Sequence, residues 1–154
     1  MTKHKPIKRH PALQELSKDH HQGLLLCFKI RQGIKLEVEE ERIKKYCDWF
    51  WIEHLAPHFS EEEQFIFPVL GNDDALVRRA LEEHKHLKTL FQKGQVDYDL
   101  LKKIENDLEA HIRFEERVLF NKIQDVATEE ELETIAKNHA GQPSCAVWED
   151  EFWK

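Results

Sequence analysis

The segment HFSEEEQFIF at residues 58–67 returns in outline as HIRFEERVLF at residues 111–120. Each segment reads histidine, three residues, two glutamates, three residues and phenylalanine. Residues four apart on an α-helix lie one above the other on the same face. The apolar residues around both motifs recur at steps of three and four, which is typical of an amphipathic helix. The repeat therefore predicts two matching long helices, each presenting a histidine and a glutamate from its apolar face.

A second pair of matching positions precedes the two motifs. Asp19-His20 and Glu83-His84 both place an acidic residue directly before a histidine. The chain thus reads as a weak internal duplication, in which an acid-His pair followed by an HxxxE motif occurs twice. Two such halves would meet around an approximate two-fold axis, which would set two equivalent metal ions side by side.

Hydrophobic periodicity covers most of the chain and predicts four long helices and a shorter fifth one. We expect the long helices over about residues 12–32, 38–70, 74–93 and 97–124. Gly33 predicts the end of the first helix, and Pro57 predicts a kink or break in the second. Thr128 and Glu131 predict a capping box at the start of the fifth. The expected fold is all-α: an antiparallel up-down-up-down four-helix bundle with a short C-terminal helix.

No linker divides the sequence, so we expect one domain over residues 1–154, with a bundle core at about 12–124 and a helix and tail at 128–154. The tail contains Trp148, Phe152 and Trp153, whose large rings are expected to pack back on the bundle. An aromatic, acidic tail would also suit a protein partner, whose identity the sequence leaves unknown.

The composition limits the kinds of partner. The chain carries a net charge of −7 and no long basic stripe, so we expect no nucleic-acid binding. No apolar run approaches the ~20 residues of a membrane helix, so we expect no membrane insertion. The basic stretch at residues 3–10 is interpreted as a flexible arm rather than a signal peptide. The widely spaced Cys27, Cys47 and Cys145 indicate reduced thiols and a cytoplasmic protein.

The candidate metal ligands are His20, His58, Glu62, His84, His111 and Glu115. Both glutamates fall in stripes otherwise made of apolar residues, and a buried carboxylate is very costly unless it is paired or bound to a metal. Either HxxxE motif alone could be an exposed salt pair, but two copies in matched register favour a metal. Four imidazoles and two carboxylates around an open position suit iron best, with manganese or zinc as alternatives.

Neighbouring histidines compete for two of these positions. His20 is favoured over His21 because His20 shares the apolar stripe of the first helix. His84 is favoured over His86 because His84 aligns with the apolar residues of the third helix. Both choices follow from the three-and-four spacing of helix faces.

Three more residues near the motifs have open roles. His54 lies one turn before His58 and is expected to be a core histidine beside the site, with a ligand role as the alternative. Glu61 and Glu63 are expected to be solvated, unless a distortion at Pro57 turns Glu61 toward the metals.

Taken together, these motifs resemble the hemerythrin-like HHE cation-binding family over about Leu13 to Phe120. The resemblance implies an up-down-up-down bundle with a non-haem, oxo- or hydroxo-bridged centre of two iron ions. It implies one histidine ligand from each of the first and third helices, a His–Glu pair from each of the second and fourth, and carboxylates that bridge the metals. Carried over position by position, the ligands are His20, His58 with Glu62, His84, and His111 with Glu115.

The chain departs from the oxygen-carrying members of that family in two places. Those proteins have a second histidine one turn before the third-helix ligand, where this chain has Ala80. They also separate the fourth-helix histidine from an aspartate by five residues, whereas His111 and Glu115 are four apart. The chain is therefore more similar to six-ligand bacterial and regulatory members than to simple oxygen carriers.

Three classes of function fit these features. The leading one is a metal-binding module that binds or senses dioxygen, nitric oxide or iron. The second is a di-iron redox enzyme, such as an oxidase, a peroxidase, a nitric-oxide-handling protein or an iron–sulfur repair protein, although no separate catalytic acid or base stands out. The third is an interaction module that metal stabilises, with the aromatic tail as its contact. Fold alone does not choose among them.

Overall fold

A computed structural model describes residues 8–138 and 148–154, and every regular element within these ranges is helical. The all-α class is therefore confirmed for this part of the chain. The elements in chain order are α1 (Pro11–Lys35), α2 (Glu40–Phe50), η1 (Trp51–Leu55), α3 (Ala56–Glu61), η2 (Glu62–Ile66), η3 (Phe67–Val69), α4 (Ala75–Phe91), α5 (Tyr98–Phe114), η4 (Glu115–Leu119), α6 (Phe120–Val126) and α7 (Glu129–Asn138).

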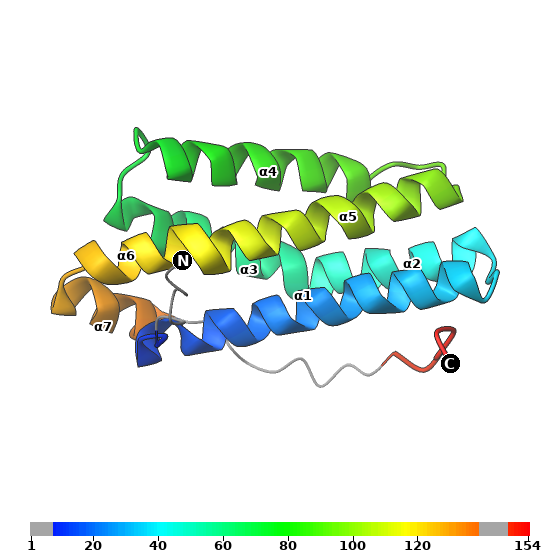
Figure 1. Ribbon diagram of the computed structural model, residues 1–154, viewed down its shortest axis with the longest axis horizontal. Coiled ribbons are helices and arrows are strands. Elements are labelled where there is room, and N and C mark those ends of the chain that lie inside the picture. Colours follow the sequence, from blue (N-terminus) through cyan, green and yellow to red (C-terminus); the bar gives the residue numbers. More distant parts are fainter. Residues whose placement is uncertain (1–7, 139–147) are drawn as a thin grey trace, which may run out of the picture.

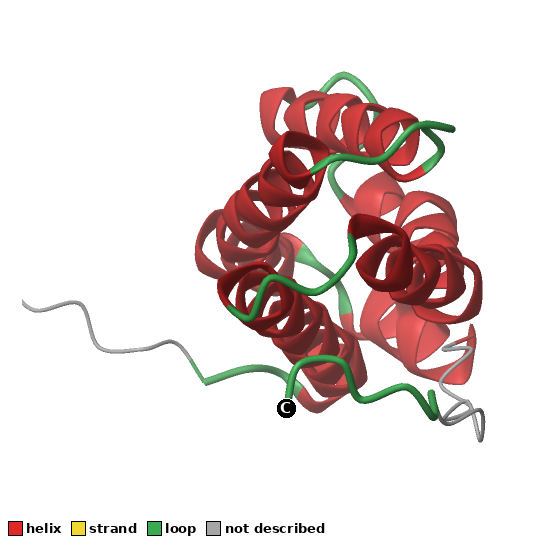
Figure 2. Ribbon diagram, turned by 90° about the vertical axis from the view of Figure 1, so that its right-hand side faces the viewer, coloured by secondary structure: helices red, strands yellow, loops and turns green. Residues whose placement is uncertain are grey.

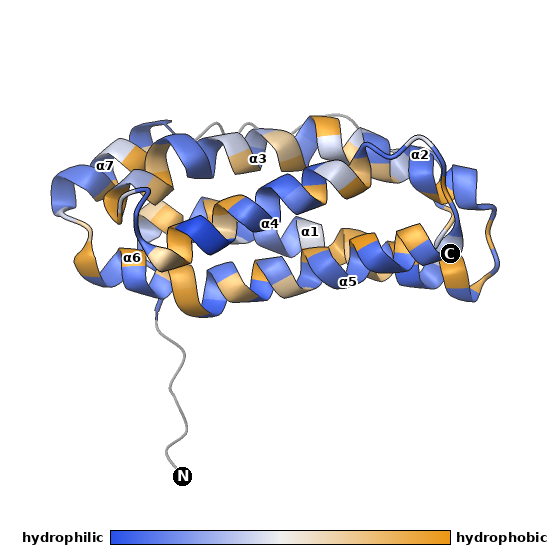
Figure 3. Cartoon of the chain, turned by 90° about the horizontal axis from the view of Figure 1, so that it is seen from above, coloured by the Kyte–Doolittle hydropathy of each residue, from blue (hydrophilic) through white to orange (hydrophobic). Residues whose placement is uncertain are grey.

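Long helical runs follow the long axis of the molecule in alternating directions (Figure 1). The run α1 crosses the molecule, α2 to α3 returns, α4 crosses again, and α5 to α6 returns. Viewed along that axis, the runs surround a common interior (Figure 2). Hydrophobic and hydrophilic positions alternate along each run (Figure 3), as expected for helices that bury one face.

The second run contains a π-helical turn, η1, directly before Pro57. Proline lacks an N–H and its ring crowds the carbonyl four residues earlier, so an α-helix cannot continue unchanged through it. A wider turn before the proline accommodates both defects, and the run then continues as α3. The matching position in the fourth run is Ala110, and α5 is unbroken there. The predicted distortion at Pro57 is confirmed.

Gly33 does not end the first helix, contrary to the prediction. α1 continues to Lys35, and the backbone turns at Glu37, whose φ is +56°. Gly33 instead permits close packing, because a Cβ there would lie 2.8 Å from Ile43 Cδ1 and 2.9 Å from Phe152 Cε1. The glycine is needed for contact with α2 and with the tail, not for chain reversal.

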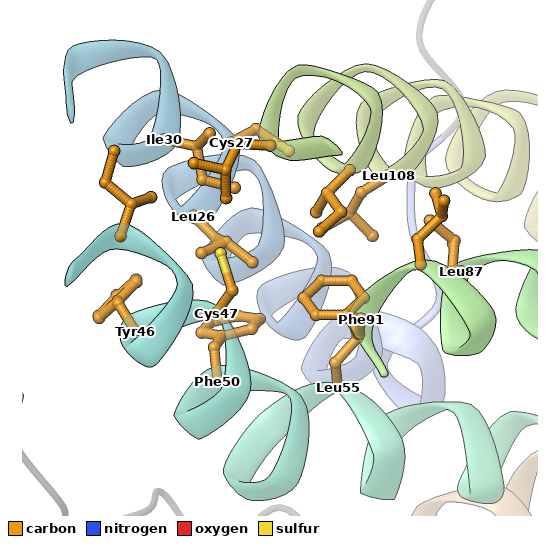
Figure 4. Close-up of a cluster of buried hydrophobic side chains, with 14 of the residues drawn as sticks. Leu26, Cys27, Ile30, Tyr46, Cys47, Phe50, Leu55, Leu87, Phe91 and Leu108 are labelled. Atoms are coloured by element: carbon orange, nitrogen blue, oxygen red, sulfur yellow. The ribbon is translucent and has the colours of Figure 1, made fainter. Parts of the chain in front are cut away.

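The buried side chains form two apolar clusters, one toward each end of the molecule. The first joins α1, α2, α4 and α5, where the side chains point toward one another (Figure 4). The second joins the start of α1 to the end of the second and fourth runs. Each long run therefore changes from one cluster to the other near its middle, and the candidate ligands lie at that change.

The tail packs as the sequence predicts in its described part. Phe152 is buried in the first cluster, and Trp148 and Trp153 pack against the same cluster. The rings of Tyr46 and Trp153 lie 5.4 Å apart between centroids. The predicted capping box is also present, with Thr128 and Glu131 each accepting the other's backbone N–H through its side chain.

The basic N-terminal stretch is not a free arm throughout. His10 caps α1 by accepting the N–H of Ala12 through Nδ1 at 3.0 Å. Arg9 donates to the backbone oxygen of Glu116 at 2.8 Å and contacts its carboxylate at 3.0 Å. No helix of the described ranges is long and apolar enough to cross a membrane. His4, His139 and Cys145 lie outside the described residues.

Candidate metal centre

Each long run brings a histidine to the middle of the bundle, and the second and fourth runs add a glutamate. All six side chains are buried although each can carry charge, and both glutamates are fully inaccessible to solvent. They are His20 from α1, His58 from α3, Glu62 from η2, His84 from α4, His111 from α5 and Glu115 from η4. The structure thus brings together the six residues that the sequence predicts.

The six side chains form two overlapping groups that share both carboxylates. One group is His20, His58, Glu62 and Glu115, and the other is Glu62, His84, His111 and Glu115. Within each group, one nitrogen or oxygen per residue lies within 4.8 Å of all the others. Each group could hold a metal ion, and the two groups have a glutamate from each half in common.

Each of the four central histidines turns its Nε2 toward Glu62, Glu115 or both. His20 Nε2 lies 2.8 Å from Glu115 and 3.6 Å from Glu62. His84 Nε2 lies 3.2 Å from Glu62 and 3.3 Å from Glu115. His58 and His111 each approach the glutamate four residues later, at 3.4 Å and 3.2 Å. These four nitrogens therefore converge on one small volume.

Each of the four central histidines also has a carboxylate at its Nδ1. These outer carboxylates come from matching positions in the two halves of the repeat. His58 Nδ1 meets Asp19 at 3.1 Å, and His111 Nδ1 meets Glu83 at 2.7 Å, so these partners come from within one half.

The remaining two histidines exchange partners between the halves. His20 Nδ1 meets Glu116, and His84 Nδ1 meets Glu63, each at 2.9 Å. Such contacts fix the orientation of a ring and which of its nitrogens is free to bind a metal. The second glutamate of each Glu-Glu pair therefore orients a histidine of the other half: Glu116 orients His20, and Glu63 orients His84.

Both shared glutamates begin a π-helical turn. η2 starts at Glu62 and η4 starts at Glu115. A π turn inserts an extra residue into a helical turn and re-aims the side chains around it. The two π turns lie at matching positions and are therefore part of the repeated structure. The π turn η1 has no counterpart in the other half and is explained by Pro57.

The buried charges shift one another's pKa values strongly. Burial by itself would lower the pKa of His20, but its contacts with Glu115 and Glu116 hold that pKa well above the ordinary value. Burial alone would also lower the pKa of His58, but Glu62 and Asp19 raise this pKa to about 9. Burial and the charge of Glu115 would raise the pKa of Glu62, yet the imidazoles of His58 and His20 lower it to about 2.

The other half shows the same directions. Burial alone would lower the pKa of His84, but Glu115 and Glu62 hold it well above the ordinary value. The pKa of His111 is likewise raised against burial, chiefly by Glu115. The pKa of Glu115 is held well below its usual range by His111 and His20, against the effect of burial. Two carboxylates thus stay ionised in the interior because four imidazoles surround them.

Several of these inner atoms lack a hydrogen-bond partner among the described residues. They are His58 Nε2, His111 Nε2 and both carboxylate oxygens of Glu62. Buried polar groups without partners are rare, because each one loses its hydration without compensation. A cation bound between the two halves would complete their coordination, and imidazole nitrogen with carboxylate oxygen is a donor set that fits such an ion.

His21 and His86 lie as predicted, whereas His54 is only partly buried. His21 and His86 are exposed, and His86 pairs with Asp107 at 2.7 Å. His54 packs against the rings of Trp49 and Phe50 at centroid distances of 5.3 Å and 5.0 Å and belongs to neither metal-competent group.

The expectation that Glu61 is solvated was wrong, because only 7% of its surface is accessible. Glu63 is exposed, as expected, but its carboxylate also contacts His84 Nδ1, a role that the sequence did not predict. The roles of Asp19, Glu83 and Glu116 were missed as well. The repeated acid-His and Glu-Glu pairs were the signal that could have revealed all four.

Aromatic rings pack on the imidazoles and complete the walls of the centre. Phe120, the last residue of the second motif, stacks on His20 at 5.0 Å, and Phe67, the last residue of the first, lies 5.4 Å from His84. Phe59 stacks face to face on His84, with centroids 3.8 Å apart. Phe50 and Phe91, by contrast, belong to the first apolar cluster.

Comparison with known proteins yields one match. The family model described as the hemerythrin HHE cation-binding domain matches residues 11–123. The match covers all six central residues and all four outer carboxylates. No curated protein and no solved structure matches the chain.

Proposed function

This chain belongs to the hemerythrin HHE cation-binding family, and we propose that it is a non-haem di-iron protein that binds or senses a small ligand such as dioxygen, nitric oxide or iron itself. The observation that carries the proposal is the overlap of two histidine–glutamate groups that share Glu62 and Glu115. Metals that share two carboxylates lie close enough to act as one centre.

In the proposed centre, each metal takes two histidines from one half of the repeat. His20 and His58 would hold the first metal, His84 and His111 would hold the second, and Glu62 and Glu115 would serve both. The Nδ1 contacts of all four rings with carboxylates support this assignment, because they leave every Nε2 free to face the metals.

Iron is the metal that this donor set suits best, with manganese or zinc as alternatives. Two imidazoles and two shared carboxylates give each metal four protein ligands, fewer than a six-coordinate ion accepts. When bound, iron would supply open coordination positions and a change of oxidation state. A solvent-derived bridge and the small ligand would fill those positions.

Ala80 supports a set of six ligands rather than seven. It is fully buried within the second apolar cluster, and its methyl group offers nothing to a metal. His54 does not replace the missing nitrogen, because it packs on Trp49 and Phe50. This vacancy favours a sensor or a redox centre over a simple oxygen carrier.

The proposal extends to the setting of the protein. Cys27 and Cys47 are buried and free, and burial raises the pKa of both thiols, to about 12 for Cys27, so neither thiol is primed for oxidation. Unpaired buried thiols suit a reducing compartment, which supports the cytoplasm. An antiparallel four-helix bundle is the arrangement that we propose for the four long runs.

Metal analysis of freshly purified protein tests the proposal. We expect about two iron ions per chain and charge-transfer absorption in the near ultraviolet. Fewer than one ion per chain after reconstitution would reject it. Stopped-flow mixing of the reduced protein with dioxygen, nitric oxide or peroxide then separates the functions. A stable reversible adduct supports binding or sensing, whereas repeated turnover would show a redox enzyme instead.

A further inference from the structure

A cavity of about 670 Å³ opens between the second run and α4, directly outside the candidate metal centre. Its walls include Phe59 and Glu63 on one side and His84 on the other. The volume lies within the range of about 300–1,000 Å³ that is usual for sites of small organic molecules. It far exceeds the size of a diatomic gas, so the proposed function does not explain it.

The cavity lies at one of the two matching interfaces of the repeat. The duplication pairs the contact between α4 and the second run with the contact between α1 and α5. α1 and α5 form the most extensive helix–helix contact of the described chain, whereas α4 approaches mainly α5. The repeat is therefore closed at one interface and open at the other.

Particular residues account for this difference. Gly23 follows His20 by three residues, and a Cβ there would lie only 2.6 Å from Ile112 Cδ1, so its absence lets α1 approach α5 closely. The residue that follows His84 by three is the bulkier Leu87. At the matching position of the second run, Phe59 stands where the other half has Ile112. Both positions therefore carry a larger side chain at the interface where the helices are further apart.

The open cavity combines aromatic and cationic surfaces. Trp51 and Phe59 are the aromatic residues of the lining, and their rings meet edge to face at 5.7 Å. Lys85 and Lys88 stand three apart on α4, so they point to the same side of the helix, and neither pairs with an acidic group of the described residues. Glu63 is already engaged by His84, and Glu82 is then the single other acidic residue in the lining. The lining thus holds two lysines and two glutamates, and Lys85 and Lys88 together form its anion-attracting part.

We propose that this cavity binds a small organic carboxylate with a flat apolar body. The body lies against Trp51 and Phe59, and the carboxylate lies between Lys85 and Lys88. The occupant also contacts the outer side of the Glu63–His84 pair, so the cavity adds a second ligand site next to the metal centre. Binding depends on the protein walls and not on a bound metal.

Isothermal titration of the full chain, as purified, with 1-naphthoate tests this proposal. We expect saturable binding of one 1-naphthoate per chain. The double variant Lys85→Ala/Lys88→Ala should weaken binding about tenfold, since it removes both cationic contacts to the carboxylate. Ser60→Trp, at an exposed position in the lining, should fill the cavity and abolish binding. The control Lys102→Ala/Lys103→Ala removes two exposed lysines from α5 and should leave binding unchanged.

Three outcomes would overturn the proposal: no binding of 1-naphthoate at millimolar concentration, equal binding of neutral 1-naphthylmethanol, or unchanged affinity in the Lys85/Lys88 variant. Repeating the titration after metal removal keeps this test separate from the proposed function. A chain that binds no iron but still binds 1-naphthoate would reject the di-iron proposal alone.

Discussion

The two halves of the repeat hold the same inner groups but meet the surface differently. Around His20, Gly23 lets α1 press against α5, and Arg9 contacts the outer carboxylate of Glu116. Around His84, the outer carboxylate of Glu63 borders an open cavity and keeps 43% of its side-chain surface exposed, against 26% for Glu116. The inner groups match because metal coordination demands the same donors twice. The outer surfaces are free to differ, and the difference leaves one side accessible.

The largest expected effect comes from the residues that both halves share. Glu62→Ala or Glu115→Ala removes a carboxylate from both metal-competent groups. We therefore expect metal content to fall from about two ions per chain to below one in either variant. Metal analysis after reconstitution measures this. The control Glu129→Ala, at an exposed position on α7, should retain two ions. Retention of one tightly bound ion in both glutamate variants would argue against shared ligands.

Next comes the loss of a ligand that belongs to one half only. His20→Ala and His84→Ala should each reduce metal content to about one ion per chain, because each leaves the other half with its two histidines. The neighbouring variants His21→Ala and His86→Ala alter exposed side chains and should keep two ions. If a neighbouring variant lost as much metal as its inner counterpart, the assignment of that half would be wrong.

A change of pH should affect both halves of the repeat alike. As pH rises, we expect the stability of the metal-free protein to fall and the affinity for metal to increase. The raised histidine pKa values stabilise the metal-free fold below the unfolded value of about 6.5. This stabilisation is lost as pH rises through the folded pKa, which is about 9 for His58.

Metal binding displaces those protons, so metal affinity should rise between pH 6 and 9, on the order of tenfold per pH unit for each proton displaced. Thermal unfolding with chelator and with metal across this range checks both trends. The account fails if the metal-free protein becomes more stable as pH rises toward 9.

The outer carboxylates give a smaller effect that sharpens the comparison directly. Glu116→Gln and Glu63→Gln each remove the charge beside one Nδ1, and such changes typically weaken metal binding about 10–100-fold. We expect the greater loss for Glu116, which is less exposed and also contacts Arg9. Competition with a chelator measures the affinities. Equal losses of metal affinity in the two variants would mean that the greater exposure of Glu63 does not weaken its contact with His84.

The smallest effect concerns the close interface alone. Gly23→Leu places a side chain against Ile112, and overpacking of this kind costs about 1–3 kcal/mol. We expect the free energy of unfolding to fall by that amount in urea titration. Gly94→Ala is the matched control, because a Cβ at Gly94 meets nothing within 4 Å. An unchanged stability for Gly23→Leu would show that α1 can move away from α5 freely.

Much of the centre follows from the sequence because helical periodicity decides which side chains face inward. His20 and His84 share a stripe with apolar residues, whereas His21 and His86 do not, and the structure separates them accordingly. The capping box at Thr128 was predictable for a similar reason, since its contacts are local in sequence.

Contacts between distant segments were harder to foresee. The exchange of Glu63 and Glu116 between halves depends on the register of one helix against another, which periodicity along a single helix does not contain. Gly33 misled in the same way, because its role is set by Ile43 and Phe152 across an interface and not by the local backbone. The cavity beside α4 likewise arises from a mismatch between two helices.

Anomalous diffraction at the iron absorption edge, from crystals of the reconstituted protein, tests the central claim most directly. The account predicts two peaks inside the bundle, one next to His20 and His58 and the other next to His84 and His111. Both peaks should lie on the Nε2 side of the rings and within bonding distance, about 2.0–2.2 Å, of Glu62 and Glu115 oxygens. A single peak, or metal bound on the Nδ1 side among the outer carboxylates, would contradict it.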